Sequence, residues 1–329
     1  MPEITSALQV LIDERRHETG RFVLTGSHQT KLFEAVSQSL AGRTSVLSLF
    51  PPDLSELADR SDAVSTDELL VRGFMPDLWV RRTDPARFYR NYYRTYVERD
   101  VRQLVMVENQ HSFEVFVRLL AGRVGQLVNL ESMSGDVGVS AHTLKKWLSV
   151  LEASYIVFRL QPYYANCGKR LVKTPKIYFS DVGLAAHLLG IGNGTQVLRD
   201  PLVGGLFENL VVAEAMKWRS NGRRFEDFYF FRDSNGLEVD LVMESARRLH
   251  LMEIKFAMTP NPSLERAIRR VAAVTSALSK TIVYRGEGFP IAGGGEYVNF
   301  GNMASRLDEL AGKRDVEWFF PVGLRSHSV

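Results

Sequence analysis

Two neighbouring apolar stretches in the last third of the chain, residues 237–243 and 251–255, constrain its fold most strongly. The first stretch contains Asp240, and the second ends in Glu253 and Lys255. Each acidic residue is flanked by apolar residues, a pattern typical of strands in a sheet. The residues between the stretches are enough for a tight turn, so the sequence predicts a β-hairpin. Because paired strands lie about 5 Å apart, we expect Asp240 and Glu253 to be close together.

These three side chains can hold a divalent metal beside a phosphodiester. Glu253 and Lys255 are two residues apart on one strand, so their side chains share a face. Carboxylate oxygens suit Mg²⁺ or Mn²⁺, which would polarise a phosphate and help to ionise an attacking water. Lys255 would offset charge in the transition state or position the water. In the alternative interpretation, Glu253 and Lys255 are an exposed strand pair and Asp240 ends a turn.

A third carboxylate lies upstream, in a helix predicted over residues 206–218. Glu208 is one turn into this apolar helix, which is unusual unless the residue faces a site. We therefore expect Glu208, Asp240 and Glu253 to be the three metal ligands. Glu214 on the same helix is the competing candidate, but we expect it to face solvent.

Composition narrows the class of protein. A chain of 329 residues is expected to form two or three domains. The single cysteine, Cys167, cannot form an internal disulfide and favours a reducing cytoplasm. No apolar run approaches the roughly 20 residues that span a bilayer, and the first residues lack the pattern of a signal peptide. We expect a cytoplasmic protein with no membrane partner.

The middle of the chain, residues 111–190, has the element order of a winged helix-turn-helix. Three helical segments come first and two strand-like runs follow. These elements are predicted over residues 113–120, 130–137, 141–152, 155–160 and 176–179.

Basic residues lie on the last of these helices and in the segment between the two strands. Lys145 and Lys146 lie on the predicted recognition helix, and Lys169, Arg170 and Lys173 lie between the strands. No acidic residue occurs from residue 161 to residue 180, so the expected wing, with Lys176 at its end, is basic. Contacts with DNA phosphates need such residues, and DNA is the expected partner. A protein-docking module is the alternative.

The N-terminal part divides into two stretches. Residues 1–52 indicate the order helix, strand, helix, strand, with the strands at 22–24 and 46–50. This is a piece of an α/β sheet that is too small to close a core by itself. Residues 53–110 are predicted to be helical. Their aromatic and arginine-rich run, 88–97, predicts a helix with its rings packed inward, and a base-stacking surface is the alternative.

Two resemblances extend this interpretation. The ordered set Glu208, Asp240 and Glu253-Ile254-Lys255 resembles the PD-(D/E)XK nuclease core of restriction and repair enzymes, over residues 202–290. The resemblance implies metal binding by the three carboxylates and catalysis by Asp240, Glu253 and Lys255. It also allows for an inactive domain of the same fold.

The N-terminal residues resemble the end of an AAA-type ATPase module. The resemblance rests on residues 21–27 and 39–43 and on a strand that ends at Pro51, and residues 148–157 and 169–179 strengthen it. Together these segments are similar to bacterial and archaeal ATPases that carry a C-terminal winged helix and a nuclease-like domain.

The chain departs from that family in its nucleotide-binding motifs. The family has a P-loop, G-x-x-x-x-G-K-[ST], and an acidic Walker B strand, and this sequence contains neither. Thr25 and Ser27 are therefore not carried over as ATPase residues, and ATP is not an expected cofactor of this chain. Arg43 is either a residue that acts on a neighbouring subunit's nucleotide or a structural arginine. The resemblance implies an N-terminally truncated member, and a natural truncation, a misassigned start and a decayed paralogue all fit.

The sequence thus predicts a multi-domain α/β protein. The expected parts are a remnant of an AAA-type core at 1–58, a helical linker or lid at 59–110, a winged helix-turn-helix at 111–190 and a nuclease-like mixed α/β domain at 202–329. The expected function is Mg²⁺-dependent phosphodiester hydrolysis on DNA. The alternative is a non-catalytic module that binds nucleic acid or protein through a degenerate nuclease fold and has no ATPase activity.

Overall fold

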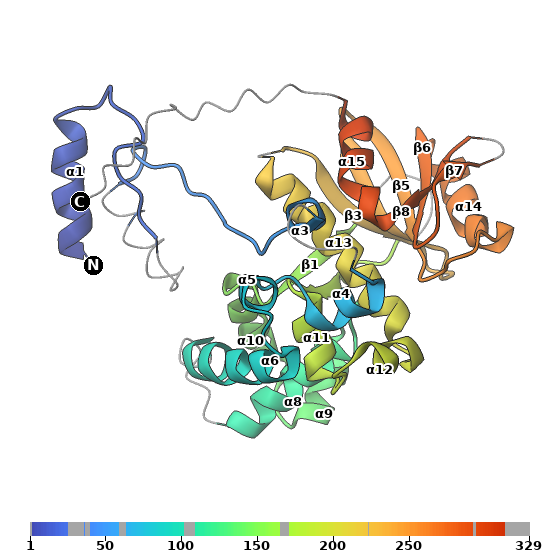
Figure 1. Ribbon diagram of the computed structural model, residues 1–329, viewed down its shortest axis with the longest axis horizontal. Coiled ribbons are helices and arrows are strands. Elements are labelled where there is room, and N and C mark those ends of the chain that lie inside the picture. The colour runs from blue at the N-terminus through green and yellow to red at the C-terminus, as the bar shows by residue number, and fades with distance from the viewer. Residues whose placement is uncertain are drawn as a thin grey trace. The chain divides into compact units, whose positions relative to one another are not determined.

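The structure is a computed structural model, and Figure 1 shows its elements along the chain. It describes residues 2–25, 36, 40–58, 64–101, 109–164, 171–222, 224–291 and 294–312. The chain divides into two compact units. The first unit comprises Met1–Pro52, Glu56–Gln161 and Lys173–Ala213. The second unit comprises Asp53–Ser55, Pro162–Val172 and Glu214–Val329. The elements are helices and a mixed sheet, so the predicted α/β class is confirmed.

The N-terminal segment contains α1 (Pro2–Asp13) and reaches α3 (Leu54–Ala58). The two strands predicted at 22–24 and 46–50 are wrong, because neither stretch forms a strand. Their apolar side chains are exposed, Leu49 by 99%. A strand needs a neighbour for its backbone groups, and the described residues of this segment supply none. The helix expected between them falls largely outside the described residues.

Short helices follow in the first unit. They are α4 (Thr66–Arg72), α5 (Pro76–Val80), α6 (Pro85–Tyr92), the π-helix η1 (Tyr93–Val101), α11 (Val182–Leu188) and α12 (Gly194–Arg199). Tyr89 and Tyr93 are buried, so the expectation of inward-packed rings is confirmed. The buried carboxylate of Asp181 accepts hydrogen bonds from the Tyr89 hydroxyl (2.6 Å), the Phe74 N–H (2.7 Å) and the Leu184 N–H (2.9 Å). One side chain thereby joins three segments of this unit.

Three helices and a hairpin occupy the stretch for which we predicted a winged helix. They are α8 (Gln110–Ala121), α9 (Leu130–Val137), α10 (Ala141–Ala153), β1 (Val157–Pro162) and β2 (Lys176–Phe179). The strands are antiparallel, with Val157 opposite Phe179. Trp147 of α10 is buried against Phe113 and Phe116 of α8. The predicted element order is present, and the winged-helix assignment stays a prediction.

The second unit is built on a mixed sheet, entered from α13 (Val203–Asn221), a helix that begins in the first unit. Its strands are β3 (Asp227–Arg232), β4 (Glu238–Ser245), β5 (Arg248–Ile254), β6 (Ser279–Tyr284), β7 (Phe289–Pro290) and β8 (Glu296–Asn299). The order across the sheet is β3-β4-β5-β6-β8-β7. Strands β3, β4 and β5 are antiparallel neighbours, whereas β5, β6 and β8 run parallel.

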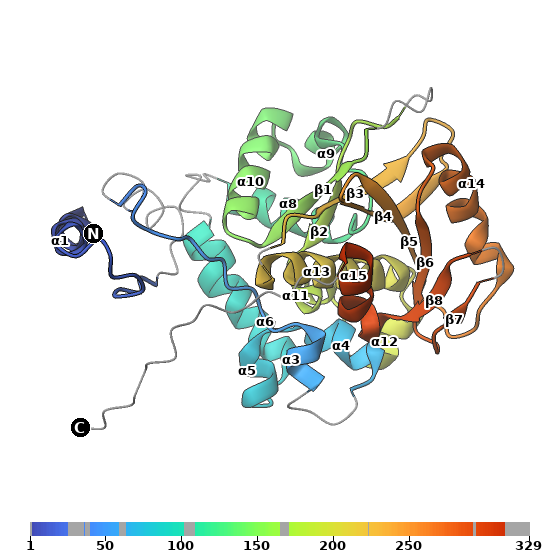
Figure 2. The same cartoon turned by 90° about the horizontal axis from the view of Figure 1, so that it is seen from above.

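Helices cover this sheet. They are η2 (Pro262–Glu265), α14 (Arg266–Thr275), η3 (Phe300–Asn302) and α15 (Met303–Ala311). Figure 2 shows α14 beside the strands β4 to β6, with which it is in contact. Ile268 and Val271 of α14 pack with Leu251 of β5 and Ile282 of β6 in the core of the unit. Within the described ranges, no helix has the length and apolar character needed to cross a bilayer.

Candidate functional site

The hairpin of β4 and β5 forms as predicted. Its pairing runs from Leu241 opposite Met252 to Ser245 opposite Arg248, with a two-residue turn at the tip. One residue further from the tip on each strand are Asp240 and Glu253. The hairpin therefore sets these two carboxylates opposite one another at its open end.

The Lys255 ammonium joins the two carboxylates. Its Nζ atom lies 2.8 Å from Oε1 of Glu253 and 3.3 Å from Oδ2 of Asp240. The same Oδ2 atom accepts a hydrogen bond of 2.8 Å from the backbone N–H of Ile254. The predicted set Asp240, Glu253 and Lys255 is thus assembled in one place. We call it the Lys255 cluster.

A β-bulge orients the first member of this cluster. Tyr229 of β3 lies opposite Val242, but Phe231 lies opposite Val239, so Asp240 and Leu241 together face Phe230 alone. Bulges commonly redirect a side chain next to a functional site. The bulge was not predicted, and the alternating apolar pattern around Asp240 gives no local signal for it.

Burial and charge set the electrostatics of the Lys255 cluster. Asp240 and Glu253 are 6% and 5% exposed, whereas the Lys255 side chain is 35% exposed. Burial alone would lower the pKa of Lys255, but the charges of Asp240 and Glu253 outweigh it and raise that pKa. Lys255 therefore stays an ammonium at neutral pH, and its partly exposed side chain lies beside two buried acidic side chains.

Glu208, the predicted third ligand, lies in the first unit. Its Oε1 atom accepts hydrogen bonds from Lys176 Nζ (2.8 Å) and the Tyr178 hydroxyl (2.6 Å). Gly125, with φ +71°, lies so close that a Cβ there would be 3.2 Å from the Glu208 carboxyl group. We call these four residues the Glu208 cluster. Among the described residues, no three His, Cys, Asp or Glu side chains are grouped to hold a metal, so the role of Glu208 stays a prediction.

Two expectations about neighbouring charges are wrong. Lys176, expected in the basic wing, is 1% exposed because it pairs with Glu208. Glu214, expected to face solvent, is 6% exposed and accepts from Lys217 Nζ (2.7 Å) and the Leu54 N–H (2.8 Å). Burial raises the pKa of Glu214, although Lys217 opposes the shift. Lys217, three residues along the helix, was the available signal for a paired carboxylate.

The predicted DNA-binding residues divide into two groups. Lys145 and Lys146 are exposed on α10, and Lys173 is exposed before β2. Lys169 and Arg170 lie outside the described residues. The exposed lysines have the surface position that phosphate contacts require.

Arg43 is held by helix α1. Its Nε and NH2 atoms lie 2.8 and 2.9 Å from the two carboxylate oxygens of Asp13. Hydrogen bonds from Arg43 and from Arg16 lower the pKa of Asp13 to about 2. This bidentate pair fits the structural interpretation of Arg43.

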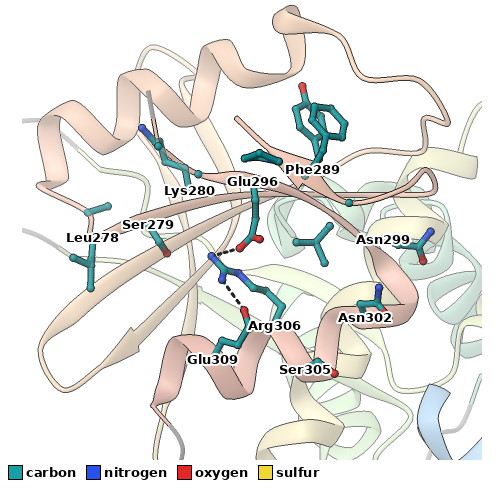
Figure 3. A pocket seen from close by; sticks show the side chains of 17 residues that line it. Leu278, Ser279, Lys280, Phe289, Glu296, Asn299, Asn302, Ser305, Arg306 and Glu309 are labelled. Carbon is teal, nitrogen blue, oxygen red and sulfur yellow. Dashed lines mark hydrogen bonds and ion pairs between the residues drawn. The ribbon is translucent and has the colours of Figure 1, made fainter. Parts of the chain in front are cut away.

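A cavity of about 720 Å³ lies at another edge of the second unit, between the β6–β8–β7 edge and α15 (Figure 3). Arg306 lies within it and pairs with Glu296 and Glu309. None of the three residues of the Lys255 cluster lines this cavity. The cavity and the candidate chemistry are therefore separate features of this unit.

Comparisons with known families match three consecutive parts of the chain. An AAA domain family matches residues 1–58. A domain of unknown function (DUF8612) matches residues 64–195, which include α8 to β2. A second domain of unknown function (DUF4143) matches residues 203–300, which include the Lys255 cluster.

Comparisons with curated proteins give relatives that are themselves uncharacterised. Proteins from Mycobacterium tuberculosis and Mycobacterium bovis are each 31% identical over 296 residues, which cover 89% of this chain and 64% of the relative. A protein from Haemophilus influenzae is 24% identical over 255 residues, 73% of this chain and 60% of the relative. The chain thus spans less than two thirds of the length of these relatives, and no solved structure matches it. The chain is therefore similar to the AAA domain family over residues 1–58 and to DUF4143 over residues 203–300.

Proposed function

We propose that the second unit is a metal-dependent phosphodiesterase that acts on DNA. The observation that carries the proposal is the Lys255 cluster, in which two buried carboxylates share one partly exposed ammonium at the end of a hairpin. The position of Asp240 at a β-bulge supports it. Two buried acidic side chains that share one partly exposed lysine are an unusual arrangement for a purely structural ion pair.

The donor atoms of this cluster fit a hard divalent cation. Asp240 and Glu253 offer carboxylate oxygens around a position that already holds positive charge, the ammonium of Lys255. Oxygen donors of this kind suit Mg²⁺ or Mn²⁺. Lys255 has a flexible stem with an exposed surface, so its ammonium can move toward a bound phosphate and leave the carboxylates to the cation.

Each residue would contribute a distinct part of the chemistry. A bound Mg²⁺ would polarise the phosphate and favour ionisation of water. The Ile254 N–H fixes Oδ2 of Asp240, so that this carboxylate needs little reorganisation. Lys255 stays protonated at neutral pH because its pKa is raised, and its charge would stabilise the negative charge of the transition state.

The segment from α8 to β2 would bring DNA to the protein. Its support is the order of three helices and a hairpin, with Lys145, Lys146 and Lys173 at the surface. Lys169 and Arg170 complete the predicted basic set. We assign Lys176 no contact with DNA because it is buried against Glu208.

A second candidate is a binding module without catalysis. It is favoured by one observation, namely that Lys255 already contacts both carboxylates, as a structural pair would. Such a module would bind DNA or a protein with an affinity that does not depend on a metal ion.

Cleavage of plasmid and linear DNA with Mg²⁺, with Mn²⁺ and with a chelator separates the two candidates. The Asp240→Asn variant tests the cluster, and the matched control is Asp227→Asn, an exposed carboxylate of the same unit paired with Arg219. We expect metal-dependent cleavage that Asp240→Asn abolishes and Asp227→Asn preserves. Cleavage that survives Asp240→Asn, or no cleavage with either metal, would favour the binding module.

ATP is not part of the proposed chemistry of this chain, since its sequence contains no P-loop. Titration of ATP into the purified chain should therefore release no saturable heat. Saturable binding would show that the chain has a nucleotide site of another kind.

A further inference from the structure

The second unit carries four exposed arginines with no carboxylate partner among the described residues. Arg266 and Arg270 lie on α14, and Arg247 and Arg248 lie at the β4–β5 turn. Their neighbour Arg269 differs, because it pairs with Glu265. Leu249 and Leu251 of β5 pack on the α14 side of the sheet, so Arg248 lies on the opposite face, with His250. We call Arg266, Arg270 and Arg247 the arginine track. Within the described part of the chain no carboxylate forms an ion pair with them, so their charges are available to a ligand.

Helix α14 places Arg266 and Arg270 away from the core. Ile268 and Val271 are 1% and 0% exposed and pack against the sheet, whereas Arg266 and Arg270 are exposed. Residues four apart lie one above the other on a helix, separated by about 6 Å along its axis. The sequence from residue 266 to residue 286 contains no acidic residue. The outer face of α14 is therefore basic, and Glu265, just before the helix, pairs with Arg269 and with neither Arg266 nor Arg270.

The helix and the turn are linked through the start of β5. The chain leaves β5 beyond the Lys255 cluster, enters α14 at Arg266 and returns to the start of β5, where the Leu278 N–H donates to the Leu249 carbonyl (2.8 Å). Figure 2 shows α14 running beside β5 in this way. The track thus begins at the end of β5 that carries the cluster and leads along α14 to the turn at Arg247.

The turn itself favours a role for its arginine. Ala246 and Arg247 both have positive φ, 49° and 62°, as in a type I′ turn. Such turns prefer glycine and asparagine because a Cβ destabilises the left-handed conformation. Arg247 therefore occupies a position where glycine would stabilise the backbone, which is the pattern expected when a side chain is kept for another purpose.

We infer that the arginine track binds the phosphate backbone of duplex DNA and holds it along the Lys255 cluster. The inference deepens the proposed function and rests on it for the choice of DNA as the ligand. Two arginines about 6 Å apart on one helix face can contact neighbouring phosphates of one DNA strand. The track supplies charge without base recognition, and its contacts should be independent of sequence.

Binding measured without metal tests the inference separately from catalysis. Fluorescence anisotropy with a labelled duplex in chelator, over a series of salt concentrations, compares the wild type with Arg266→Gln/Arg270→Gln. We expect about tenfold weaker binding and a slope of log affinity against log salt that is smaller by about 1.8, which is two phosphate contacts. The matched control is Arg219→Gln/Arg232→Gln, which removes the same charge from arginines paired with Asp227 and Glu238.

Two outcomes would overturn the inference: affinity equal to that of the wild type, or an equal loss in the control variant. Arg247→Gly gives a further test with opposite signs, since it should raise the melting temperature and weaken DNA binding. A higher melting temperature with unchanged affinity would remove the turn from the track. Arginine-dependent binding without any cleavage would uphold the track and reject the phosphodiesterase.

Discussion

Two clusters of carboxylates and lysine, one in each unit, use the same kinds of side chain in different proportions. In the Glu208 cluster one carboxylate meets one lysine, and the tyrosine hydroxyl of Tyr178 adds a further hydrogen bond. In the Lys255 cluster two carboxylates share one lysine. Lys176 is 1% exposed at its side chain and Lys255 is 35% exposed. The first cluster pairs one carboxylate with a buried lysine, whereas in the second two carboxylates share a lysine that is partly exposed.

This difference separates an ion pair that fixes structure from a group suited to chemistry. A buried one-to-one pair loses much stability when one partner is removed, because the other charge is left buried. Two carboxylates that share one lysine keep like charges close together, which costs stability and attracts a cation. The two clusters should therefore respond in opposite ways to removal of a charge.

The largest expected effect is on cleavage. Glu253→Gln removes one of two facing carboxylates, so we expect cleavage to fall by about 1,000-fold, or about 4 kcal/mol in the barrier. The free energy of unfolding should stay the same or rise, because a like-charge contact is lost. Initial rates with Mg²⁺ and urea denaturation of the same preparation measure both quantities. Lower stability together with full activity would reverse the roles given to the two clusters.

The next effect concerns the stability of the first unit. Lys176→Met leaves the carboxylate of Glu208 half-buried without its cation, and breaking such a pair typically costs about 3–5 kcal/mol. Urea denaturation of the full chain should show this loss. The double variant Lys176→Met/Glu208→Leu should recover most of it, because apolar replacement of both partners is often neutral. If the double variant has the same free energy of unfolding as the single variant, the stability does not come from neutralising the charge of Glu208 alone.

A smaller effect is expected at the backbone that approaches the Glu208 cluster. Gly125 has φ +71°, and an alanine Cβ would lie 3.2 Å from the Glu208 carboxyl group. Gly125→Ala should cost about 1–2 kcal/mol from the left-handed conformation alone. The matched substitution Gly138→Ala, at φ +76° with open space around it, should cost only that backbone share. Thermal melting of both variants measures the difference. Equal losses of stability would show that the Glu208 side chain moves aside at no cost in free energy.

The smallest expected effect is a pH dependence of stability that arises from His250, which lies on β5 like Glu253. Burial, and then the charges of Arg306 and Arg248, lower the pKa of His250, which hydrogen-bonds Ser279. The unfolded chain, with a histidine pKa near 6.5, then binds the proton more tightly than the folded one. This contribution to stability is complete above about pH 6.5 and is lost as pH falls toward the lowered pKa. Melting temperatures of the wild type and His250→Gln should converge in that window, and parallel curves would contradict the assignment.

Much of this arrangement could be predicted from the sequence. Apolar runs around Asp240 and Glu253 and a short gap between them were enough to predict the hairpin, because strand pairing follows from local pattern and turn length. The helices at α8, α9 and α10 followed from their periodicity in the same way.

Features that depend on distant residues could not be predicted. The pairing of Glu208 with Lys176 could not be predicted, because Lys176 lies in a stretch of sequence that suggested a basic wing. The strands expected at 22–24 and 46–50 required neighbours, and an apolar run carries no information about whether those neighbours exist. The burial of Glu214 depends on Leu54, which is 160 residues away along the chain.

The bulge in β4 makes the candidate chemistry separable from the fold. Because Asp240 and Leu241 share one position opposite Phe230, loss of the Asp240 codon would leave a regular ladder with Val239 opposite Phe231 and Leu241 opposite Phe230. The pairing of β3 with β4 would become regular, and the carboxylate of Asp240 would be lost. A lineage could therefore convert an active domain into a binding scaffold, or the reverse, through a single in-frame deletion or insertion at this point.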